Sequence, residues 1–99
     1  MKEWYREQIL KVIDDLKAFA NSRRPELERV IALEVAEFVE SLLEHEHIDL
    51  EEVQTVMAIA YNACYHVWER RGGKFELYVM FKELYDWLKK YVFEQKKEV

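Results

Sequence analysis

The stretch HIDLEEV, residues 47–53, carries the strongest local folding signal in the chain. Asp49 suits the N-cap of a helix, and Glu52 three residues later completes a capping box. Ile48 and Val53 occupy the two positions of a hydrophobic staple, in which apolar side chains before and after the cap pack together. A helix is therefore expected to begin at Asp49, directly after a break in the chain.

Two further breaks lie on either side of this one. In NSRRP, residues 21–25, the proline suits the first position of a helix and disfavours helix at the residue before it. The pair Gly72-Gly73 is expected to end a helix in the left-handed conformation. Apolar residues recur at helical spacing between the breaks, and short connections make consecutive helices antiparallel. The sequence predicts a single domain over residues 1–99, an all-α antiparallel up-down-up-down four-helix bundle with helices at about 2–20, 25–46, 49–71 and 74–96.

Helical periodicity also assigns the inner face of each helix. On the third helix, Cys64 falls on the apolar face and His66 on the polar face. Because residues two apart on a helix do not face each other, these two are not expected to form a reactive pair, and Cys64 is interpreted as a small core residue. On the second helix, the expected inner stripe is Leu27, Ile31, Val35, Phe38 and Leu42.

The composition restricts the classes of protein to which the chain can belong. The single cysteine excludes an internal disulfide, the N-terminal residues are too charged for a signal peptide, and no apolar run approaches the ~20 residues needed to span a bilayer. The chain is therefore expected to be cytoplasmic, with no membrane partner. Abundant charged residues beside few Ser, Thr, Asn and Gln are typical of proteins from heat-loving organisms.

Charge is unevenly distributed along the chain. Residues 30–69 contain nine acidic residues and no Lys or Arg, whereas the remainder holds 15 basic and 11 acidic residues. The predicted topology places the first and third connections at the same end of the bundle, which would gather several bases there. This end is a candidate anion- or partner-binding site, which could bind phosphates of a nucleic acid, an acidic protein surface or the acidic end of a second copy. The residues of this candidate site are Arg23, Arg24, Arg70, Arg71 and Lys74.

Aromatic residues are concentrated in the first and fourth helices, beyond what one inner stripe requires. Surplus aromatic area is typical of interfaces between proteins. We therefore expect a face formed by these two helices to bind a protein partner or a second copy of the chain, through Trp4, Tyr5, Tyr78, Tyr85, Trp87 and Tyr91.

Two patterns in the sequence have the spacing of known catalytic motifs. Glu44 and His47 have the Glu-x-x-His spacing of di-iron bundles, but those bundles use that motif twice and this chain has it once. Asn62 and His66 resemble part of the Arg-(Asn/His)-x-x-x-His signature of HEPN-type ribonucleases, with Tyr61 in the place of the arginine. The sequence therefore predicts no catalytic residue, no metal site and no cofactor.

These patterns together predict a small non-enzymatic protein–protein interaction or assembly module, without a small-molecule substrate. The first alternative is an accessory subunit of a phage, plasmid or defence system that contacts nucleic acid through the basic end. The second alternative is a metal-dependent or nucleolytic enzyme that uses Glu44, His47 or His66.

Overall fold

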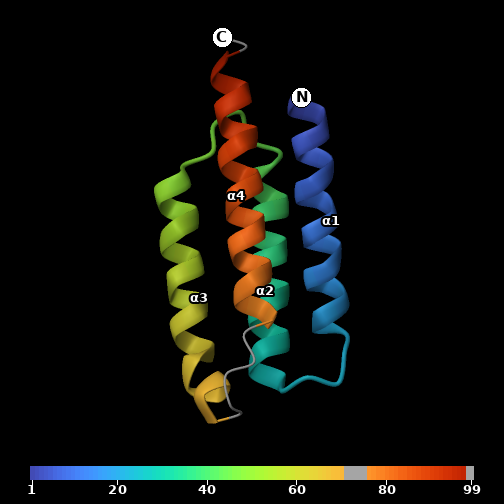
Figure 1. Ribbon diagram of the computed structural model, residues 1–99, viewed down its shortest axis with the longest axis vertical. Helices are drawn as coiled ribbons and strands as arrows, with labels where there is room; N and C mark the ends of the chain where they lie inside the picture. The colour runs from blue at the N-terminus through green and yellow to red at the C-terminus, as the bar shows by residue number, and fades with distance from the viewer. Residues whose placement is uncertain (71–75, 98–99) are drawn as a thin grey trace.

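The computed structural model describes residues 1–70 and 76–97, which form four α-helices and no strand (Figure 1). Consecutive helices run antiparallel, and α1 and α3 lie on opposite sides of the pair formed by α2 and α4. The predicted all-α up-down-up-down bundle is confirmed. Its helices are α1 (Lys2–Ala20), α2 (Glu26–Leu42), α3 (Leu50–Arg70) and α4 (Glu76–Lys97).

The start of α3 follows the predicted capping chemistry. The Asp49 side chain accepts hydrogen bonds from the backbone N–H of Glu51 at 2.9 Å and of Glu52 at 3.4 Å. These bonds satisfy donors that the first turn of a helix otherwise leaves without partners. Ile48 and Val53 are both buried in the core, as expected of a hydrophobic staple.

The bounds of α2 differ from the prediction at both ends. Pro25 precedes the helix in an extended conformation, with φ −53° and ψ 143°, so it is not the first helical residue. At the other end α2 stops at Leu42, four residues early, where the N–H of His45 donates to the carbonyl of Leu42 at 3.0 Å in a tighter turn. The reason is distance: a longer helix would leave too few residues to bring Ile48 into the core and still place Asp49 as the cap of α3.

The inner face of α2 was also predicted wrongly. Its buried residues are Glu28, Ala32, Val35, Ala36 and Val39, so only Val35 of the predicted stripe is fully buried. Because α2 is apolar on more than one side, periodicity alone fits more than one inner stripe. The small side chains of Ala32 and Ala36 are completely buried, and larger residues at these positions would hold α2 away from its neighbours in the core.

Candidate functional site

The start of α2 and the start of α4, which the sequence predicts to share a basic surface, lie next to each other. The guanidinium of Arg24, just before α2, pairs with the carboxylate of Glu76, at the start of α4, at 2.7 Å. Arg24 also lies over the ring of Phe19, 5.4 Å from its centroid, and its carbonyl accepts a 2.8 Å hydrogen bond from Arg29. Arg24 is therefore held by neighbours on three elements of the bundle.

Charge at this end is balanced within the part of the chain that the structure describes. Arg71 and Lys74, two of the five predicted binding residues, lie outside it. The sequence prediction counted only basic residues, but acidic residues stand beside them at the same helix ends. The described bases are Arg23, Arg24, Arg29 and Arg70, and the described acids are Glu26, Glu28, Glu69 and Glu76. The described residues thus give no excess of positive charge, and anion binding stays a prediction.

The predicted aromatic face divides into two separate regions. Trp4, Tyr5 and Trp87 form a cluster between α1 and α4, in which the Trp4 ring lies 5.3 Å from Trp87 and 5.4 Å from Tyr5, centroid to centroid. Within it Trp4 remains 46% exposed. Tyr91 is only 4% exposed and belongs to the core, so its ring is not available to a partner as predicted.

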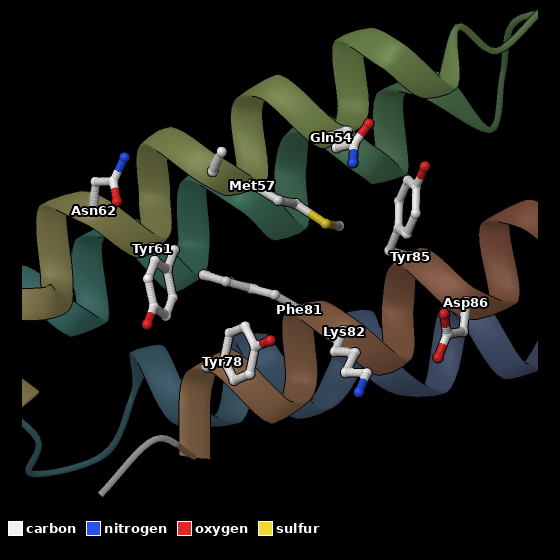
Figure 2. A pocket seen from close by; sticks show the side chains of 10 residues that line it. Gln54, Met57, Tyr61, Asn62, Tyr78, Phe81, Lys82, Tyr85 and Asp86 are labelled. Carbon is white, nitrogen blue, oxygen red and sulfur yellow. The ribbon is translucent and has the colours of Figure 1, made fainter. Parts of the chain in front are cut away.

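Tyr78 and Tyr85 lie on the other side of α4, where they line a groove against α3 with a volume of about 370 Å³. Figure 2 shows side chains from both helices pointing into the space between them. The ring centroids of Tyr61 on α3 and Tyr78 on α4 are 5.0 Å apart. The Tyr61 ring also packs against the buried ring of Trp68, with 5.4 Å between the two centroids, so one wall of the groove is continuous with the core.

The groove is open because α3 approaches α4 closely at few places. Ala58 on α3 is too small to fill the space, while Met57 and Phe81 form an apolar floor. Its polar lining is mixed in charge: the amides Gln54 and Asn62, the ammonium of Lys82 and the carboxylate of Asp86. Such a lining suits apolar and aromatic side chains in its centre and hydrogen-bonding groups at its edge.

The sequence did not reveal this groove. The sequence prediction gives Tyr61 no role beyond a motif position, and it assigns Tyr78 and Tyr85 to a face formed with α1. A signal does exist, since Tyr78 and Tyr85 are seven residues apart and therefore share one side of α4. Which neighbour that side meets depends on the handedness of the bundle, which periodicity does not determine.

Cys64 and His66 have the separate environments that periodicity predicted. Cys64 is completely buried, whereas His66 is exposed. Burial, together with a smaller contribution from the nearby Glu28 carboxylate, raises the pKa of the Cys64 thiol to about 11. At neutral pH this thiol is almost entirely protonated, which makes it a poor nucleophile.

The Glu44 and His47 pair does not form the predicted helical motif. Both residues are exposed and lie in the α2–α3 connection rather than on a helix, because α2 ends at Leu42. They therefore do not share a helical face, which was the geometric reason to consider them. Across residues 1–70 and 76–97 there is no group of three or more His, Cys, Asp or Glu residues placed to hold a metal ion.

Comparison of the chain with models of protein families, with curated proteins and with solved structures finds no match. None of the helices in the described ranges contains a stretch long and apolar enough to cross a membrane.

Proposed function

We propose that the protein is a small non-enzymatic protein-binding module, which receives apolar side chains of a helical partner in the groove between α3 and α4. The observation that carries the proposal is the groove itself, an opening of about 370 Å³ lined by aromatic rings from two helices. Aromatic side chains are enriched at binding surfaces because they offer large contact area and lose little conformational entropy. The buried, protonated Cys64 thiol is compatible with a reducing, cytoplasmic setting.

A helical partner fits the dimensions of the groove. Tyr78 and Tyr85 are seven residues apart on α4, which corresponds to about 10 Å along the helix. An amphipathic helix presents side chains at the same spacing, because its residues i, i+3, i+4 and i+7 also share one face. Gln54 and Asn62 at the edge offer both hydrogen-bond donors and acceptors to the polar side of such a helix.

The proposal is tested by identifying what the protein retains from an extract of its source cells. Wild-type protein is compared with Tyr78→Lys, which places a charge in the groove, and with Val79→Lys as the matched control. Val79 is the next residue on α4, is 60% exposed and does not line the groove. We expect one protein to be retained by the wild type and the control but lost by Tyr78→Lys, with circular dichroism showing equal helix content.

Three outcomes would contradict the proposal: equal retention by both variants, retention of nucleic acid alone, or no retained protein. Retention of nucleic acid that is lost when Arg23 and Arg70 are changed to Glu would instead support the accessory-subunit alternative. Sedimentation of purified protein shows whether the partner is a second copy, since Tyr78→Lys would then also dissociate an oligomer.

A further inference from the structure

The helix α2 carries a second apolar stripe that the bundle covers only in part. Leu27, Ile31, Phe38 and Leu42 share one side of α2, and they remain exposed or half-buried while another stripe faces the core. A helix that is apolar around most of its circumference is normally covered on more than one side. The second stripe of α2 is therefore a surface that still lacks a neighbour along part of its width.

The adjacent side of α3 extends this surface. Ile31 and Phe38 on α2 and Val56 and Ile59 on α3 line a second groove, of about 320 Å³, and Ile59 is 65% exposed. Apolar residues at the start of α2 add to this face, since Leu27 is 43% exposed. A contiguous exposed apolar surface of this kind marks an interaction site more often than isolated exposed residues do. We refer to the surface formed by these five residues as the α2/α3 face.

The charged residues nearest the middle of the α2/α3 face are acidic, whereas Arg70 lies at its end, eleven residues after Ile59 on the same side of α3. Glu34 lines the groove, and Glu52 shares the side of α3 that carries Ile59, since it lies seven residues earlier on the helix. No Lys or Arg occurs between residues 30 and 69. Lys17 of α1 pairs with Glu40 at 2.8 Å on a part of α2 that lines a different hollow, and Arg29 of α2 donates to the carbonyl of Arg24 at 2.8 Å.

We propose that the α2/α3 face docks a basic amphipathic helix of a partner protein. The apolar stripe of that helix would lie in the groove, and its Lys or Arg residues would face Glu34 and Glu52. A symmetric dimer through this face is disfavoured, because it would bring the acidic residues of both copies together. The proposal does not depend on the proposed function, since it concerns the opposite side of α3.

A synthetic peptide provides the probe. It is a helix-forming sequence of about 18 residues, or five turns, with a leucine stripe flanked by lysines, and its control has glutamates in place of the lysines. Binding to the intact protein is followed by fluorescence anisotropy. We expect the lysine peptide alone to bind, and its Kd to rise at least about tenfold when salt increases from about 50 mM to about 500 mM.

Matched variants locate the bound peptide. Ile59→Lys is expected to raise the Kd at least about tenfold, because it removes apolar area and adds a like charge. Val79→Lys, at a similarly exposed position on α4, and Tyr78→Lys, in the other groove, should leave the Kd unchanged. Glu34→Gln should reduce the salt dependence. Because Ile59 is 65% exposed, its substitution should not disturb folding, which circular dichroism verifies.

The proposal is overturned if neither peptide binds, if both bind equally, or if Val79→Lys weakens binding as much as Ile59→Lys does. It is also overturned if the purified protein forms a dimer that Ile59→Lys dissociates, because the face would then be covered by a second copy. Loss of binding in Tyr78→Lys alone would place the peptide in the α3/α4 groove and would contradict the proposal in favour of the proposed function.

Discussion

The helices α1 and α3 occupy equivalent positions on opposite sides of α2 and α4, yet they pack differently. Both place a full apolar stripe in the core, but α1 lies close to both neighbours, whereas α3 leaves a groove on each side. The residues that flank the stripe explain the difference. On α1 they include Tyr5 and Leu10, which pack against the core; on α3 the flanking Ala58 lines the α3/α4 groove, and Ala60, a small residue of the stripe itself, lines the α2/α3 groove. The inner apolar stripe places a helix in the bundle, and the volume of the side chains beside that stripe decides whether the gaps to the neighbouring helices are filled.

The test with the largest expected effect truncates one large buried side chain on α1 and one on α3. Leu16→Ala on α1 is expected to lower the free energy of unfolding by about 3–5 kcal/mol, because the closely packed surroundings cannot collapse into the cavity. Met57→Ala on α3 should cost about 2 kcal/mol, since Met57 already borders an open groove. Urea unfolding at equilibrium measures both. Equal losses would show that α3 is packed as tightly as α1.

The second test asks whether the loose packing of α3 reaches its inner face. The Cys64 thiol has its pKa raised from 9.0 to about 11, so below pH 9 it is protonated in both the folded and unfolded states. Between pH 9 and 11 the unfolded chain loses this proton while the folded protein keeps it, so stability falls as pH rises, by up to about 2–3 kcal/mol.

Urea midpoints at about pH 8 and about pH 10.5 check this expectation in the wild type and in Cys64→Ala. The variant should lose less stability over this interval, which separates the contribution of the thiol from that of the groups common to both proteins. An identical loss in both proteins would mean that water reaches the thiol and that α3 is open on its inner side.

The third test adds volume instead of removing it. Ala36→Leu on the inner face of α2 should destabilise the protein by about 1–3 kcal/mol, because no space remains for three more carbon atoms. Ala58→Leu should be tolerated with little change in stability, because the side chain can enter the α3/α4 groove. Thermal unfolding compares the two variants. A strongly destabilised Ala58→Leu would show that the groove cannot accept an apolar side chain.

The smallest expected effect concerns the ion pair that joins the ends of α2 and α4. Arg24 and Glu76 are both partly exposed, so solvent screens their 2.7 Å contact. A double-mutant cycle with Arg24→Gln and Glu76→Gln should give a coupling below about 1 kcal/mol that declines with salt. A larger coupling that is insensitive to salt would show that the Arg24–Glu76 end of the bundle is shielded from solvent and is more rigid than the contacts of α3 with α2 and α4.

Part of this architecture follows from the sequence alone. The Asp49 cap, the antiparallel order of the helices, the burial of Cys64 and the proximity of Arg24 to the start of α4 were all predicted, as were the helix ends to within a few residues. These features depend on capping and periodicity, which act over about four residues, and on short connections that leave one arrangement of neighbours.

Only the tertiary structure decided which of the apolar stripes of α2 faces inward and that Tyr78 and Tyr85 face α3 rather than α1. Each of these depends on how side chains from different helices fill shared volume. A single helix satisfies its own periodicity in several orientations, and close packing against its neighbours selects one of them. The two grooves beside α3 arise in the same way, from space that no local pattern in the sequence describes.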